Sequence, residues 1–173
     1  YNNELGDDKD YCIYIDTDSV FFSALPIIEK RFPNQKLSDV MMTQRISEIA
    51  SEVQSFINRM YGQFSKRFCN LDNHRFEIKQ EIIARAGLFI VKKRYGMKII
   101  SDNGVKVNKI LMKGIDTVRS NFPTALRLIL KEVLEDILSD VPKDKIDERI
   151  LNFKDKMKSM DVDEIATPTT VKG

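Results

Sequence analysis

The sequence predicts an α+β fold, on the strength of three observations. Short runs of aromatic and β-branched residues, typical of strands, cluster at residues 11–25 and 76–112. Within residues 39–68 the apolar side chains recur every three or four positions, as they do on one face of a long helix. Two further segments with helical spacing follow prolines near the C-terminal end. A sheet with one long helix, followed by two further helices, is typical of the α+β class.

The first strands flank an acidic turn. Two apolar runs, residues 11–15 and 20–25, are joined by the polar sequence Asp-Thr-Asp-Ser at residues 16–19. Its carboxylates, Asp16 and Asp18, repel each other unless a cation neutralises them. Hard divalent cations such as Mg²⁺ prefer carboxylate oxygens, so the pair is a candidate metal site. A solvated turn is the alternative interpretation, because Asp and Ser favour turns in any case.

A loop and one long helix are expected next. Residues 26–38 are predicted to form the loop, with Pro33-Asn34 as its turn signal. Residues 39–68 are predicted to form an amphipathic helix that packs across the back of the sheet. We expect its apolar stripe to be core material. The stripe consists of Ile46, Ile49, Val53, Phe56, Met60 and Phe64.

The remaining strands and helices follow from local patterns. Strands are predicted over residues 76–83, 88–91, 95–101 and 105–112. Asn103-Gly104, between the last two, indicates a type I′ hairpin turn. Residues 113–120 are predicted to form a connector. Pro123 is expected to open one helix, and a second, with apolar residues from Ile146 to Met160, is expected after Pro142.

Composition places the chain among ordinary globular proteins. Its 173 residues suffice for one core or one core with a satellite subdomain. The two cysteines, Cys12 and Cys69, lack metal or redox spacing and fit a reduced, intracellular compartment. The longest apolar run is too short to cross a bilayer, so no membrane partner is expected. His74 is the only histidine, which excludes His-dependent catalytic arrangements and multi-His metal sites.

Basic residues gather between residues 85 and 119. Nine basic residues and two acidic ones lie there, a local charge of +7. Such a patch fits a phosphate backbone, although a lysine-rich sheet edge that deters aggregation would show the same charge. The basic residues are Arg85, Lys92, Lys93, Arg94, Lys98, Lys106, Lys109, Lys113 and Arg119.

Three motifs, in this order, resemble those of a known family. Tyr14-Ile-Asp-Thr-Asp-Ser19 resembles the motif that carries a catalytic aspartate in the palm of family B DNA polymerases. Lys92-Lys-Arg-Tyr95 resembles the family's Lys-Lys-x-Tyr element, which touches the primer strand. The segment that begins Lys113-Gly-Ile-Asp is similar to the one that leads from palm to thumb. The resemblance covers nearly the whole chain and is closest to phage-type replicative enzymes.

The resemblance implies a domain organisation. Residues 1–120 would form the C-terminal part of a palm, with an antiparallel sheet, a catalytic hairpin and a long packing helix. Residues 121–173 would form the helical start of a thumb. The family's other polymerase and exonuclease motifs lie upstream of the position where this chain begins. We therefore expect a fragment of a longer polymerase, cut at both ends and inactive by itself.

The resemblance also assigns catalytic roles. It implies two-metal-ion nucleotidyl transfer, with Mg²⁺, from deoxynucleoside triphosphates onto a primer 3′-hydroxyl. Asp18 would be the direct metal ligand, and Asp16 would lie beside the site as a weaker one. Glu81 is either an auxiliary carboxylate or a structural strand residue. Thr17 and Ser19 would fix the turn through hydrogen bonds to the backbone.

Primer-template DNA is the implied partner. Lys93 is the candidate for a minor-groove contact at the primer end, where every base pair offers an acceptor. Lys92, Arg94 and Tyr95 would bind primer phosphate and sugar, and Lys113 and Arg119 are weaker backbone candidates. A sliding clamp is a further candidate partner, through the parent enzyme. The expected location is cytoplasmic, in the host cell if the source is viral.

A non-catalytic nucleic-acid-binding module with a palm-like fold is the alternative function. The presence of both Asp16 and Asp18 argues against it, because a pure binding module gains nothing from two repelling charges. A calcium-binding loop would need a third acid, a glycine and a distal glutamate, which the turn lacks. A reverse transcriptase would carry Tyr-x-Asp-Asp, which is absent.

Overall fold

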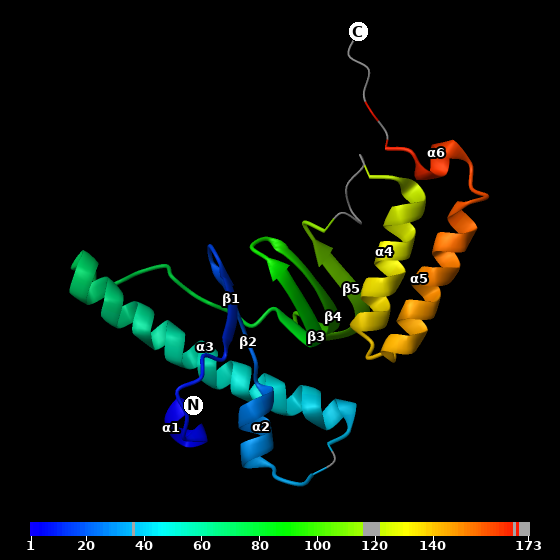
Figure 1. The fold of residues 1–173 in the computed structure, drawn as a ribbon. Coiled ribbons are helices and arrows are strands. Elements are labelled where there is room, and N and C mark those ends of the chain that lie inside the picture. Colours follow the sequence, from blue (N-terminus) through cyan, green and yellow to red (C-terminus); the bar gives the residue numbers. More distant parts are fainter. Residues whose placement is uncertain (36, 116–121, 168, 170–173) are drawn as a thin grey trace. The chain divides into compact units, whose positions relative to one another are not determined.

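Two compact units make up the computed structural model, which describes residues 1–35, 37–115, 122–167 and 169. The first unit comprises Tyr1–Ile83 with Ser101–Lys106, and the second comprises Ala84–Ile100 with Val107–Gly173. Helices accompany two antiparallel sheets, one of two strands and one of three, so the α+β prediction is confirmed (Figure 1). The predicted domain boundary after residue 120 lies outside the described residues.

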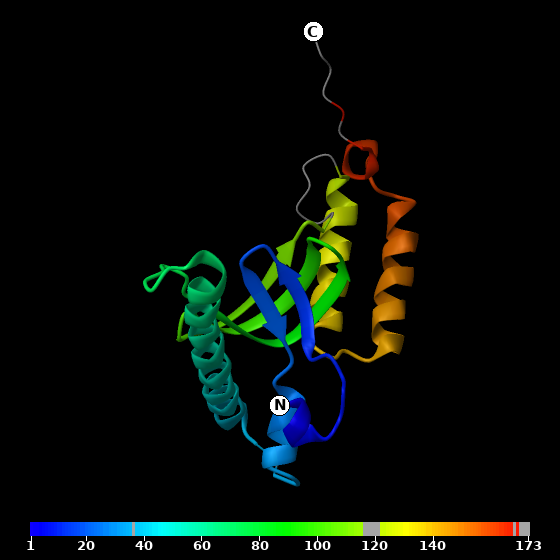
Figure 2. The same ribbon diagram turned by 90° about the vertical axis from the view of Figure 1, so that its left-hand side faces the viewer.

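The acidic turn connects a two-stranded hairpin in the first unit. Strands β1 (Cys12–Asp16) and β2 (Ser19–Phe22) pair antiparallel, with Asp16 opposite Ser19 (Figure 2). The register shifts between Cys12 and Tyr14, as at a β-bulge. This hairpin confirms the first two predicted strands.

A helix replaces the first part of the predicted loop over residues 26–38. Helix α2 spans Leu25–Arg31, and a short helix α1 (Asn2–Leu5) precedes the hairpin. The loop prediction treated Pro26 as a breaker, but this proline lies in the first turn of α2, where its missing N–H is not needed. Ile27 and Ile28, each 2 % exposed, drive the helix into the core of the unit.

The long helix is confirmed as α3 (Asp39–Cys69), but its apolar stripe is only partly core. Ser38 caps its first turn by accepting a hydrogen bond from the Met41 amide. Ile49 is 2 % exposed and belongs to the core cluster. The C-terminal part of the stripe, by contrast, is open: Phe56, Met60 and Phe64 are 53, 42 and 51 % exposed. The core prediction is wrong for these three, because the core cluster reaches α3 only in its first half.

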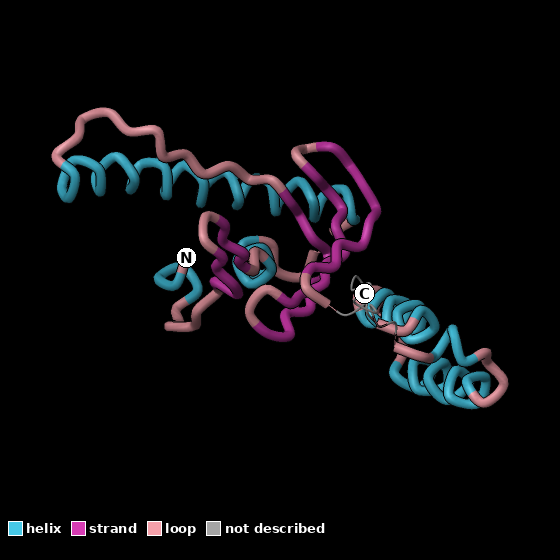
Figure 3. Tube along the Cα trace, turned by 90° about the horizontal axis from the view of Figure 1, so that it is seen from above, coloured by secondary structure: helices cyan, strands magenta, loops and turns pink. Residues whose placement is uncertain are grey.

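Residues 70–81 run back along α3 without forming a strand (Figure 3). The Asn58 side chain donates to the carbonyl of Ile78 at 3.1 Å and accepts from its amide at 2.8 Å. Gln54 Oε1 accepts from the Gln80 amide at 2.8 Å. Helix side chains thus satisfy backbone groups that a partner strand would otherwise satisfy. The strand predicted over 76–83 therefore begins only at Ile82.

Three strands form the second sheet, in the order β3-β4-β5. They span Ile82–Val91, Arg94–Asp102 and Val105–Lys113. The strands predicted over 76–83 and 88–91 are thus replaced by the single strand β3. Asn103 and Gly104 have φ values of 48° and 79°, which confirms the type I′ turn. On the central strand Tyr95, Met97 and Ile99 are buried.

Helices α4 (Thr124–Ile137), α5 (Lys143–Met157) and α6 (Val162–Ile165) complete the second unit. Pro123 and Pro142 immediately precede α4 and α5, as predicted, but α5 ends before Met160. Helices α4 and α5 lie side by side (Figure 1). Arg149 joins them through ion pairs with Asp136 at 2.6 Å and Glu132 at 3.0 Å.

Candidate functional site

The acidic turn is held by hydrogen bonds to a single residue. The Asp16 carbonyl accepts from the Asp18 amide at 2.7 Å and from the Ser19 hydroxyl at 3.1 Å. The Thr17 hydroxyl donates to Asp16 Oδ1 at 3.2 Å. Asp16 is half-buried, whereas Asp18 is exposed at the tip of the turn. The turn therefore fixes Asp16 and leaves the Asp18 carboxylate accessible.

Thr17 has a strained backbone. Its φ is 56°, in the left-handed region, which a β-branched residue rarely adopts. Such a conformation costs on the order of 1–3 kcal/mol and persists only where the surroundings impose it. Residues of this kind cluster at active sites and ligand-binding loops. The outlier thus points to the same turn as the two carboxylates.

No described residue neutralises the two carboxylates: within residues 1–35, 37–115, 122–167 and 169, neither Asp16 nor Asp18 forms an ion pair. Two unneutralised carboxylates on one turn match the oxygen ligands that Mg²⁺ prefers. The described part of the chain holds no group of three or more His, Cys, Asp or Glu side chains able to bind a metal ion. The turn thus fits a divalent cation as part of a ligand set.

Glu81 lies in the same unit, directly before β3. Its side chain is exposed. Its backbone carbonyl accepts a hydrogen bond from the Asn103 amide at 2.6 Å, which fastens the β4–β5 turn to this point of the chain. Because the described residues contain no three-carboxylate group, the structure does not join Glu81 with Asp16 and Asp18 in one cluster.

Lys92 and Lys93 form the two-residue turn between β3 and β4, in the second unit. Both side chains are exposed. Lys93 has a φ of 64°, so this turn, like the acidic one, contains a non-glycine residue in the left-handed region. The sequence motif that holds the predicted DNA contacts is therefore a tight, solvent-facing turn.

The segment after β5 packs against this basic turn. Arg94 Nε donates to the Gly114 carbonyl at 2.9 Å, and Lys113 Nζ lies 5.8 Å from the centre of the Tyr95 ring. Tyr95 is only 4 % exposed, and its ring lies against Phe89. The structure thus brings Lys113 to the Lys-Lys motif. Arg119, the last predicted DNA contact, lies outside the described residues.

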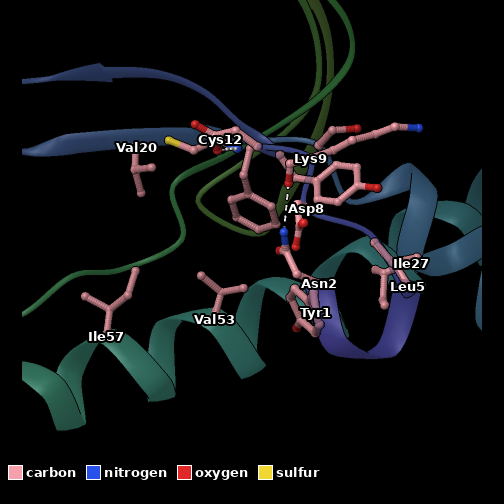
Figure 4. Close-up of a pocket in the computed structure, with 14 residues that line it drawn as sticks. Tyr1, Asn2, Leu5, Asp8, Lys9, Cys12, Val20, Ile27, Val53 and Ile57 are labelled. Carbon is pink, nitrogen blue, oxygen red and sulfur yellow. Dashed lines mark hydrogen bonds between the residues drawn. The ribbon is translucent and has the colours of Figure 1, made fainter.

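A pocket of about 470 Å³ in the first unit is separate from the predicted site residues. Cys12 and Val20 from the hairpin and Val53 and Ile57 from α3 line it, together with residues of the N-terminal segment (Figure 4). Burial raises the pKa of the Cys12 thiol, and the Asp10 carboxylate raises it further. The higher pKa leaves less of the reactive thiolate.

Gly114 is a contact of the basic turn that the sequence analysis missed. Its φ is 65°, and it touches the Lys93 backbone, although it lies well after Lys93 in the sequence. The only local signal was a glycine two residues after the last predicted strand, in the motif that begins at Lys113.

Comparison with known families agrees with these motifs. The profile of DNA polymerase family B matches residues 6–169. The chain belongs to DNA polymerase family B. Membership confirms the resemblance and implies that this polymerase acts on DNA and nucleotides; family B polymerases generally use divalent metal ions. No curated protein matches the chain in a direct sequence comparison. Among the described residues of the polymerase chain, no helix is long and apolar enough to cross a membrane.

Proposed function

We propose that the chain supplies the palm and thumb base of a longer, DNA-directed DNA polymerase, of the phage-type replicative kind that its motifs resemble. The enzyme would add deoxynucleotides to the 3′-hydroxyl of a primer on a DNA template. The observation that carries the proposal is the strained turn with two unneutralised carboxylates, in a chain of this family. Carboxylates placed in this way suit divalent cations better than they suit a solvated turn.

The two aspartates have different roles in this proposal. Asp18, exposed at the tip, binds a catalytic cation directly. Asp16 is tied to Thr17, and its carbonyl receives the Asp18 amide, so it sets the position of Asp18 and shapes the local field. Glu81 is the auxiliary acid. Bound Mg²⁺ would lower the pKa of the primer hydroxyl and stabilise the negative charge on the reacting phosphate.

The basic turn holds the primer. Lys93 donates to acceptors in the minor groove, which every base pair presents, so it detects correct pairing without reading sequence. Lys92, Arg94 and Lys113 bind phosphate and sugar oxygens. Tyr95 was also expected to bind primer phosphate and sugar, but it is only 4 % exposed, so in this proposal it contributes by packing beneath this surface.

Primer extension tests the proposal. A complete polymerase that contains this chain should extend a primer with Mg²⁺ and deoxynucleotides and should stop when the metal is chelated. The isolated chain should bind primer-template DNA but not extend it, because the described residues hold only part of a metal-ligand set. Extension by the isolated chain would contradict its assignment as a palm and thumb piece. A complete protein that binds DNA yet never extends a primer would favour the non-catalytic binding module.

A further inference from the structure

The Lys92–Lys93 turn is held in place by a glycine that lies far from it in sequence. We propose that Gly114 is a positioning residue for this turn: it fixes the Lys93 backbone so that the lysine reaches the primer. The inference rests on the proposed function of the turn as a DNA contact. It assigns Gly114 no contact with DNA of its own.

Steric fit is the first argument. A methyl group added at Gly114 would overlap the carbonyl oxygen of Lys93 and would lie 3.2 Å from its carbonyl carbon and 3.3 Å from Arg94 Cγ. The overlap is with backbone, which cannot swing aside as the end of a side chain can. Any side chain at position 114 therefore forces the Lys93 peptide and the backbone of residue 114 apart.

Backbone conformation is the second argument. Lys93 has a φ of 64°, which a residue with a Cβ holds only when its neighbours impose it. Gly114 supplies two such constraints: its close contact with the Lys93 carbonyl, and its own carbonyl, which accepts from Arg94 Nε at 2.9 Å. The turn is thus held on both sides of the Lys93–Arg94 peptide.

Pre-organisation links this geometry to DNA binding. A lysine side chain is flexible, and fixing it in a complex costs conformational entropy. A backbone already fixed at Lys93 reduces that cost and aims the ammonium group at the groove. A displaced Lys93 peptide would keep the charge of the turn but would no longer reach the minor groove.

Gly104 offers a matched control. Its φ of 79° is also in the left-handed region, but a Cβ there would meet nothing within 4 Å. Gly104→Ala therefore imposes the same kind of backbone strain without the collision. A difference between Gly104→Ala and Gly114→Ala reports the contact with Lys93 and not the strain of alanine at positive φ.

The test measures the affinity of the 173-residue chain for a fluorescent primer-template duplex, well below the thermal midpoint of each variant. Lys93→Ala and Gly114→Ala should each weaken binding about tenfold, the size of one charge-assisted hydrogen bond. Gly104→Ala should bind like the original chain. In the Lys93→Ala background, Gly114→Ala should have almost no further effect, because the group it positions is gone. If Gly114→Ala acted only by destabilising the fold, its loss of affinity would add to that of Lys93→Ala.

If Gly114→Ala does not fold, Arg94→Lys replaces it in the same cycle. This substitution keeps the positive charge but removes the Nε donor to the Gly114 carbonyl. Because Arg94 is itself a proposed phosphate contact, only part of its effect on affinity should disappear in the Lys93→Ala background, and this non-additive part reports the positioning of Lys93. An effect of either variant that is fully additive with Lys93→Ala would overturn the positioning role.

A failure of the positioning role and a failure of the proposed function would give different results. If Lys93→Ala weakens binding but Gly114→Ala equals Gly104→Ala, Gly114 does not position the turn, and the proposed function stands. If Lys93→Ala binds DNA as the original chain does, the Lys-Lys turn is not a DNA contact, and the inference about Gly114 fails with it.

Discussion

The acidic turn (residues 16–19) and the basic turn (Lys92 and Lys93) share a backbone conformation but carry opposite charge. Each is a two-residue hairpin turn with one non-glycine residue at positive φ, Thr17 at 56° and Lys93 at 64°. The acidic turn is held from within, through the carbonyl and carboxylate of Asp16. The basic turn is held from outside, by Gly114 beyond the next two strands. The proposed metal site and the proposed DNA contact thus rest on similarly strained turns with different supports.

Substitutions that remove charge from the turns should change DNA affinity the most, so they test the comparison first. Replacing Lys92 and Lys93 by alanine should weaken primer-template binding by more than tenfold if each lysine contributes about one charge-assisted hydrogen bond. The slope of log affinity against log salt should fall by about one unit for each lysine that no longer binds a phosphate.

The double substitution of Asp16→Asn and Asp18→Asn, measured in a metal chelator, should instead leave binding unchanged or tighten it, because negative charge near phosphates is removed. Fluorescence anisotropy over a salt series measures both.

The control for these variants is Lys66→Ala. Lys66 lies in α3, is 77 % exposed and pairs with Asp72, so its replacement removes one positive charge without altering either turn. It should alter affinity only slightly. If the aspartate substitutions weaken metal-free binding as much as the lysine substitutions do, the two turns do not have opposite roles.

Substitutions that relieve backbone strain should give a smaller effect, on the free energy of unfolding. Asparagine tolerates the left-handed region better than threonine or lysine does. Thr17→Asn and Lys93→Asn should therefore raise the free energy of unfolding, each by up to about 1 kcal/mol, less whatever the original side chain contributed through its own interactions. Urea denaturation measures the change. Thr43→Asn, in the regular helix α3, is the matched control and should give no gain. A decrease in stability at both turns would contradict the prediction that relief of strain outweighs the lost side-chain interactions.

Local patterns accounted for much of the fold. The hairpin around Asp16 and Asp18, the helix from Asp39 and the Asn103-Gly104 turn were all predicted from neighbouring residues. Their determinants, alternation, helical spacing and turn chemistry, act within a few positions.

The errors arose where distant contacts decide the structure. Residues 76–81 have a strand-like composition, but Gln54 and Asn58 of α3 take up their backbone groups. The segment around Pro26 became a helix because Ile27 and Ile28 are buried against α3. Gly114 gained its importance only when folding brought it to Lys93. None of these contacts leaves a periodic signal in the sequence.

Single-turnover nucleotide incorporation tests the central claim, that the acidic turn is the catalytic metal site with Asp18 as direct ligand. The rates would be measured at saturating Mg²⁺ in a complete polymerase that contains this chain, with Asp18→Asn and Asp16→Asn compared. Loss of a direct metal ligand removes several kcal/mol of transition-state stabilisation, so Asp18→Asn should lower the rate by orders of magnitude. Asp16→Asn should leave a weakened but measurable rate. The reverse order would make Asp16 the ligand, and two unaffected rates would contradict the metal site altogether.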